Sequence, residues 1–178
     1  TINPSSDLLE STQYYVQIPA TAFDDFVGNS FAAISDTTSL SFTTAAPPDT
    51  TNPTLTSSTP ADSATAIAVE SNIVLNFSEA VDVESGNIVI YKSSDNSVVE
   101  TIDVTSGQVT GSGTTQITIN PSNNLLSNTQ YYVQIAATAF DDPSGNSYAG
   151  ISDTTSLSFR TPDGDVTNQT LSSTTPAD

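Results

Sequence analysis

The feature that most constrains this chain is an internal repeat. Residues 1–42 align without gaps with residues 118–159, at an offset of 117, and 33 of the 42 positions are identical. A second match joins residues 49–62 to residues 165–178 at an offset of 116, with ten of 14 positions identical. A repeat of this length means that one folding unit of about 116 residues occurs more than once.

The repeat predicts how the chain is organised. Residues 1–48 are expected to be the C-terminal half of one module, and residues 49–162 a complete module. Residues 163–178 are expected to be a linker and the first strand of the next module. Because the chain starts and stops in the middle of a unit, we expect it to come from a longer tandem array. Pro47 and Pro48 are expected to stiffen the junction between modules.

Short alternating stretches of apolar and polar residues predict an all-β fold. Ile73, Leu75 and Phe77, for example, alternate with polar or smaller residues, as in a strand with one buried face. Clusters of Gly, Asn, Asp, Ser and Pro between these stretches predict turns about every ten residues. No apolar face recurs at helical spacing over ten positions. The predicted strands lie at 73–78, 87–91, 98–104, 109–110, 116–119, 131–135 and 157–159, which together are typical of a Greek-key β-sandwich.

A tyrosine near the start of a predicted strand supports the same fold. Tyr131 follows Leu125 by six residues, and Tyr14 follows Leu8 at the same spacing. In Greek-key sandwiches a tyrosine at this place bonds through its hydroxyl to backbone upstream, and we expect this structural role for Tyr14 and Tyr131.

Several motifs together resemble bacterial Ig-like domains of the SbsA type. They are the segments 49–54, 58–62 and 73–81, and the closing stretch 137–161 with its Asp-Asp-Pro-Ser-Gly-Asn turn. The resemblance implies Ig-like β-sandwich modules in tandem. It also implies a place in surface-layer proteins, large secreted adhesins or extracellular enzymes, where such modules act as lattice units, stalks or spacers.

The composition excludes several functions. The formal net charge is −18, with 20 acidic residues against Lys92 and Arg160. We therefore do not expect the chain to bind the phosphate groups of nucleic acid or an anionic membrane surface. The sequence contains no run of about 18 apolar residues, so we expect no membrane insertion. The sequence has no His and no Cys, which removes Ser-His-Asp and Cys-His catalysis. We therefore expect no enzymatic activity, no catalytic residues and no required cofactor.

The acidic residues favour one metal. Without His or Cys, ligands must be oxygen atoms, which suit Ca²⁺ and, less readily, Mg²⁺. Asp24 or Asp25 is expected to approach Asp49 and Glu79 of the following module, and Asp141 or Asp142 to lie near Asp163 and Asp165. Glu79 and Asp82 are expected to follow the strand at 73–78. The alternative is that these residues only cap turns. The candidate Ca²⁺ ligands at module junctions are Asp24, Asp25, Asp49, Glu79, Asp82, Asp141, Asp142 and Asp165.

The leading hypothesis for function is mechanical: an extracellular, bacterial cell-surface repeat protein that forms a rod, filament or surface layer. Its partners would be neighbouring modules of the same protein, with self-association into a polymer. A glycan- or surface-binding adhesin module is the second hypothesis, for which Tyr15, Tyr132, Phe31 and Tyr148 are the candidate contact residues. A spacer in a secreted multidomain enzyme is the third.

Overall fold

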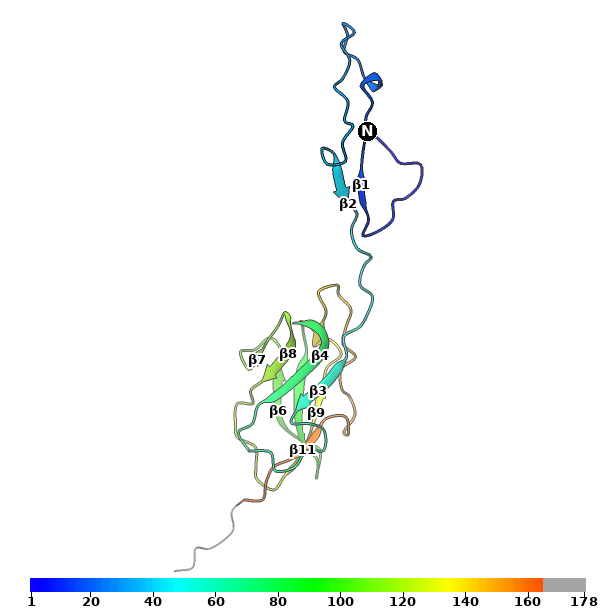
Figure 1. Cartoon of the computed structure of the whole chain (residues 1–178). Helices are drawn as coiled ribbons and strands as arrows, with labels where there is room; N and C mark the ends of the chain where they lie inside the picture. Colours follow the sequence, from blue (N-terminus) through cyan, green and yellow to red (C-terminus); the bar gives the residue numbers. More distant parts are fainter. Residues whose placement is uncertain (165–178) are drawn as a thin grey trace, which may run out of the picture. The chain divides into compact units, whose positions relative to one another are not determined.

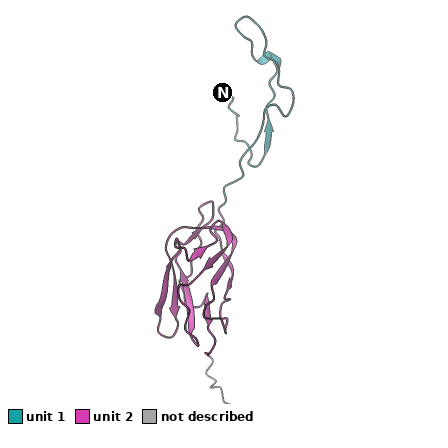
Figure 2. Ribbon diagram, turned by 90° about the vertical axis from the view of Figure 1, so that its left-hand side faces the viewer, with its two compact units in different colours: residues 1–49 teal, residues 50–178 magenta. Residues whose placement is uncertain are grey.

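The computed structural model describes residues 1–164; the predicted strand of a third module falls on residues 165–178, outside the described part. The chain separates into two compact units, Thr1–Asp49 and Thr50–Asp178 (Figure 2). We call them unit 1 and unit 2 and describe each by itself.

Unit 2 is a sandwich of two antiparallel sheets (Figure 1). In the first sheet the order is β10-β4-β8-β7, and β3 also pairs with β4; in the second it is β11-β9-β5-β6. Spatial neighbours such as β4 and β8, or β5 and β9, are distant in sequence, so the chain crosses between the sheets. The strands are β3 (Leu55–Thr59), β4 (Ile73–Val83), β5 (Asn87–Lys92), β6 (Ser97–Asp103), β7 (Val109–Thr110), β8 (Thr114–Ile119), β9 (Gln130–Ile135), β10 (Phe140–Asp141) and β11 (Ser158–Arg160).

The core of unit 2 lies between the two sheets. Ile73, Leu75 and Phe77 of β4 are buried from one side, and Tyr131 and Val133 of β9 from the other. Burying each such side chain contributes roughly 1.5–3 kcal/mol, which explains why alternation sets the strand positions. The predicted all-β sandwich fold is confirmed.

Strand β4 is longer than predicted. It continues to Val83 through a register shift against β8, between Asn76 and Val81. Glu79 and Asp82 are therefore inside β4, whereas the sequence placed them after the strand. The Ser-Glu-Ala sequence that interrupts the apolar alternation is accommodated by this irregularity. Strand β3 was not predicted, because its Thr and Ser residues are mostly exposed.

Unit 1 contains a two-stranded antiparallel sheet of β1 (Gln13–Tyr15) and β2 (Ser41–Thr43). A single 3-10 turn, η1 (Ala20–Ala22), follows β1. None of the residues 1–49 is buried, although this segment carries many of the apolar residues whose repeat equivalents form the core of unit 2. Within residues 1–164, no helix is long and apolar enough to cross a membrane.

Candidate functional site

Three acidic side chains converge at the N-terminal end of unit 2. Asp49 directly precedes this unit, Glu79 belongs to β4, and Asp142 follows β10. One carboxylate oxygen from each lies within 4.8 Å of the other two. Asp49 is exposed, Glu79 is half-buried, and Asp142 is only 3% exposed. We call these three residues the acidic cluster.

Asp142 is held in place by its own turn. Its Oδ1 accepts hydrogen bonds from the backbone N–H groups of Ser144 and Asn146, both at 2.8 Å, and its Oδ2 accepts one from Asn146 Nδ2 at 2.8 Å. The hydrogen bond from the Asn146 side chain, with those from the backbone, lowers the pKa of Asp142. The carboxylate is therefore ionised at neutral pH and carries its charge into a buried position.

The arrangement suits a hard divalent cation. Carboxylate oxygens are the ligands that Ca²⁺ prefers, and three negative charges this close repel one another unless a cation lies among them. The cluster brings together Asp49, Glu79 and Asp142, three of the candidate ligands predicted from the sequence. The sequence placed Asp24 or Asp25 beside Asp49 and Glu79, and Asp141 or Asp142 beside Asp163 and Asp165. In the structure the residue grouped with Asp49 and Glu79 is Asp142.

The direction of the strands explains this difference. Strand β9 starts at Gln130, which pairs with Arg160, and the chain reaches Asp142 only after β9 has crossed the sandwich. Asp163 lies near the start of β9, with its Oδ1 atom 4.0 Å from Nη2 of Arg160. Asp165 lies outside the described residues.

The other predicted ligands make different contacts. Asp82 and Asp141 are register partners on β4 and β10, and Asp82 accepts a hydrogen bond of 3.3 Å from Ser112 Oγ. In unit 1, Asp24 pairs with Ser30 in an isolated bridge. Asp25 bonds to its own turn through the N–H groups of Val27 and Asn29 and the Asn29 side chain, as Asp142 does in unit 2.

Both predicted structural tyrosines bond to backbone upstream. The Tyr131 hydroxyl accepts a hydrogen bond of 2.9 Å from the N–H of Leu126, and the Tyr14 hydroxyl accepts one of 2.9 Å from the N–H of Leu9. The partner in each case is the residue five positions before the tyrosine.

The aromatic residues proposed for ligand contact differ between the units. In unit 2, Tyr132 and Tyr148 are buried, and burial, with the charge of Asp153, raises the pKa of Tyr148 to about 12. In unit 1, Tyr15 and Phe31 are exposed. The complete module thus keeps neither of its two candidate aromatics accessible.

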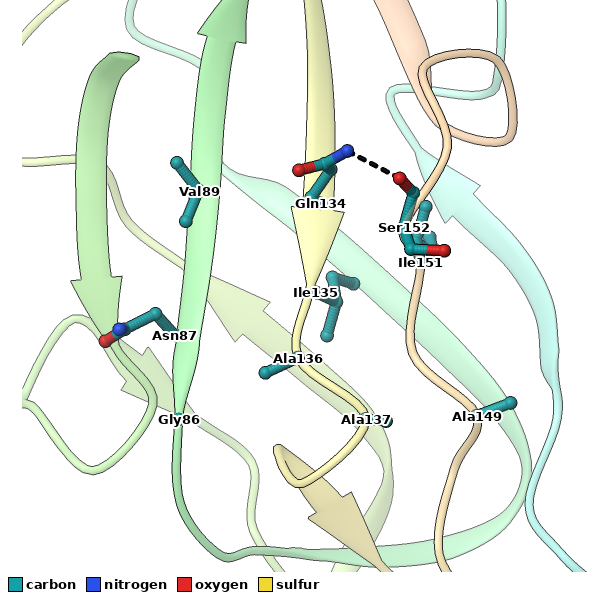
Figure 3. A pocket seen from close by; sticks show the side chains of 10 residues that line it. All are labelled: Gly86, Asn87, Val89, Gln134, Ile135, Ala136, Ala137, Ala149, Ile151 and Ser152. Atoms are coloured by element: carbon teal, nitrogen blue, oxygen red, sulfur yellow. Dashed lines mark hydrogen bonds between the residues drawn. The ribbon is translucent and has the colours of Figure 1, made fainter.

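A hollow of about 520 Å³ on unit 2 lies over β5, β9 and the segment 149–152 (Figure 3). Gln134 is one of its lining residues and donates a hydrogen bond of 2.6 Å to the carbonyl of Ser152. The residues that line it are small, aliphatic or amide side chains, among which there is no nucleophile–base pair and no charge. This lining can pack against a surface but offers nothing to polarise a bond.

The two basic residues, which sequence reasoning treated separately, lie at one end of the second sheet. Lys92 ends β5 and Arg160 ends β11, and both line a hollow of about 300 Å³. Lys92 Nζ is 3.7 Å from Asp95, and Arg160 also bonds to Asn128. The two residues are close because β5 and β11 both pair with β9, one on each side, and end at the same end of the sheet. Strand β9 has no charged residue, so nothing in the sequence indicated this closeness.

The comparison with protein families agrees with this architecture. A family model described as a bacterial Ig-like domain matches residues 1–44 and 49–161. Among solved structures, the crystal structure of the S-layer protein rSbsC is similar at 15% identity and a TM-score of 0.42, covering 63% of this chain. The chain spans 14% of the length of that protein. No curated protein matches the chain.

Proposed function

Because the chain belongs to the bacterial Ig-like domain family, we propose that it is a structural repeat module of an extracellular bacterial surface protein. In this proposal successive modules form a rod, filament or surface layer, and neighbouring modules are the main partners. The observation that carries it is the repeat itself, with 33 of 42 aligned positions identical. A periodic assembly needs equal units with equal junctions, and near-identity of successive units supplies them.

The chemistry of the module supports a role without catalysis. The chain has no His or Cys, and Lys92 is engaged with Asp95 at the end of a strand. Several carboxylates, among them those of Asp142 and Asp153, accept hydrogen bonds from their own turns. Acids bound in this way fix loop geometry and keep the surface soluble, as expected of a spacer or lattice unit.

The adhesin alternative is supported less well. A sugar site in a sandwich needs accessible aromatic faces, yet Tyr132 and Tyr148 are 5% and 6% exposed. A glycan array incubated with the chain separates the two functions. We expect no reproducible binding, and binding that is lost in a Tyr15→Ala variant would favour the adhesin instead.

We also propose that the acidic cluster binds Ca²⁺ and thereby stiffens the start of the module. The support is the 4.8 Å limit on the separation of three carboxylate oxygens from Asp49, Glu79 and Asp142. A cation here would join the segment before β3 to β4 and to the turn after β10.

Surface location has a direct test. Antibodies raised against this chain should label intact cells that produce the parent protein, and permeabilising the cells should add little signal. Labelling that appears only after permeabilisation would overturn the proposal. The labelling depends on location alone, so its result is independent of whether the acidic cluster binds a cation.

A further inference from the structure

We propose that unit 1 is an open half-sandwich, and that its exposed apolar face and free strand edge bind a polypeptide segment of the type of residues 49–117. In unit 2 this segment, which we call the front half, directly precedes the residues that correspond to Thr1. The inference concerns folding and is independent of where the parent protein is located.

Unit 1 already has the local structure of the last part of unit 2. The pairs Tyr14–Phe42 in β1 and β2 and Tyr131–Phe159 in β9 and β11 have the same register. Gln17 Nε2 donates to the carbonyl of Ser35 at 2.6 Å, as Gln134 does to Ser152. The register of this strand pair and the glutamine–serine hydrogen bond are thus the same in both units.

What differs is burial. Phe42 is 45% exposed, whereas its equivalent Phe159 is 1% exposed. Phe23 is 58% exposed, whereas its equivalent Phe140 is completely buried. Exposed apolar side chains gathered in one small unit mark a surface that binds another polypeptide. The residues of unit 1 concerned, whose equivalents belong to the core of unit 2, are Phe23, Phe31, Leu40 and Phe42.

Unit 2 identifies what covers these positions. Phe77 of β4 lies with its ring centroid 5.4 Å from that of Phe140 and 5.1 Å from that of Tyr148. Phe23 and Phe31 of unit 1 are the equivalents of the latter two, and in unit 1 their rings contact each other at 6.1 Å. The missing neighbour is therefore an aromatic residue on a β4-like strand.

The strand edges give the same answer. Strand β9 is paired on both sides, with β11 and with β5, whereas β1 pairs only with β2 in the described residues. Val16 N–H donates to Leu40, so the alternate N–H groups of Tyr15 and Gln17 point to the other edge of β1. A β5-like strand can add to this edge by main-chain hydrogen bonds.

Two further contacts define the fit. In unit 2 Asp62 accepts hydrogen bonds from the N–H and hydroxyl of Ser158, and Ala64 bridges to Phe159, so the front half also covers the edge of β11. One bond of unit 2 cannot form in unit 1. In unit 2 the N–H of Ala136 donates to the carbonyl of Asn87, whereas the equivalent residue of unit 1, Pro19, has no N–H. The front half would therefore pair with β1 over a slightly shorter length.

The test is hydrogen exchange on the full chain with a second copy of residues 49–117 joined before Thr1. We expect exchange at Tyr15 and Gln17 to slow by roughly a hundredfold or more relative to the original chain. The same amides in unit 2, Tyr132 and Gln134, are the internal reference for a folded module. Unchanged exchange at Tyr15 and Gln17 in the extended chain would overturn the proposal.

Two matched variants of the extended chain test the face itself. Phe42→Asp should abolish the new protection, because its equivalent is buried in unit 2. Leu9→Asp should keep it, because Leu9 is 71% exposed and its equivalent Leu126 is 65% exposed in the complete module. Equal loss in both variants would contradict the proposed face.

A second copy of the chain is the competing occupant. In that case Tyr15 and Gln17 of the original chain would already be protected, increasingly so at higher protein concentration, and sedimentation would show a dimer that Phe42→Asp dissociates. That outcome would replace the front half as the partner. Slow exchange confined to the extended chain, independent of concentration, would support it.

Discussion

The rings of Tyr91 and Tyr132 stack on the outer surface of the second sheet, with centroids 4.8 Å apart and planes inclined by 9°. The two residues are register partners on β5 and β9. The Tyr132 hydroxyl also donates a hydrogen bond of 3.2 Å to Asn96 Oδ1. An aromatic side chain that points away from the core is thus buried by its cross-strand neighbour, and it acts as part of the fold rather than as an exposed platform.

This pair gives a matched comparison between the two units. Tyr132→Ala should lower the free energy of unfolding of unit 2 by roughly 2–4 kcal/mol, because it removes a buried ring together with its stacking contact on Tyr91. Tyr15→Ala, at the equivalent position of unit 1, should change stability by no more than about 0.5 kcal/mol, because Tyr15 is 54% exposed. Urea unfolding followed by circular dichroism measures both. Equal effects would mean that the stack contributes nothing.

The hydroxyl of Tyr131 can be tested without disturbing the core. Tyr131→Phe keeps the buried ring but leaves the N–H of Leu126 without its acceptor, so we expect a loss of about 1–2 kcal/mol in unfolding free energy. Tyr91→Phe serves as the control for removing a tyrosine hydroxyl on the same sheet. A Tyr131→Phe variant as stable as the unchanged chain would show that the hydrogen bond has no net value.

Two glycines with positive φ differ in the space around them. A Cβ at Gly150 would lie 2.5 Å from the carbonyl oxygen of Ile135, whereas a Cβ at Gly145 would meet nothing within 4 Å. Both Ala variants incur the cost of a left-handed backbone, of about 1–2 kcal/mol. Gly150→Ala should therefore be clearly more destabilising than Gly145→Ala in thermal unfolding. The reverse order would contradict the close packing of the segment 149–151 on β9.

Acid should weaken unit 2 through Asp153. Its carboxylate accepts hydrogen bonds from the side chain and N–H of Ser156 and from Thr155, which hold the pKa of Asp153 well below 3.8. A lowered native pKa contributes stability that is complete above the unfolded pKa and is lost as pH falls below it. We therefore expect the urea midpoint to fall between about pH 4 and pH 2.

The measurement needs salt and a control. Protonation also relieves the repulsion from a net charge of −18, which acts in the opposite direction. Working at about 1 M salt, where the Debye length is about 3 Å, suppresses this effect. Asp153→Asn should make the midpoint less dependent on pH, whereas Glu70→Gln, at an exposed position, should leave the fall unchanged. Parallel curves for all three proteins would rule out Asp153 as the cause.

Calcium should raise the melting temperature if the acidic cluster binds it. At a Ca²⁺ concentration ten times the dissociation constant, linkage predicts a gain of about 1.4 kcal/mol, which a chelator should reverse. Glu79→Gln should reduce the gain, and Glu70→Gln should retain it. Identical melting with calcium and with chelator would leave Asp49, Glu79 and Asp142 with a structural role only.

Alternation predicted most of the fold, and its failures have physical causes. The strands around Ile73, Ile88 and Tyr131 are where the pattern put them, because each has one fully buried face. Strand β3 was missed because its Ser and Thr residues give no apolar alternation. The acidic cluster was predicted only in part, because adjacency of Asp142 to Glu79 depends on which end of the sandwich β9 reaches, and residue types do not specify that.

The seven-residue segment Thr12–Ile18 is identical in sequence to Thr129–Ile135, yet only the second copy is buried in a core. During folding, the front half of unit 2 therefore meets two acceptor strands, β1 and β9, with the same sequence and the same main-chain geometry. Only loop length and the few positions that differ between the copies, such as Pro19 against Ala136, favour the correct partner. Pairing with the wrong acceptor is thus an intrinsic hazard of this chain, and it grows with every nearly identical module placed beside the first.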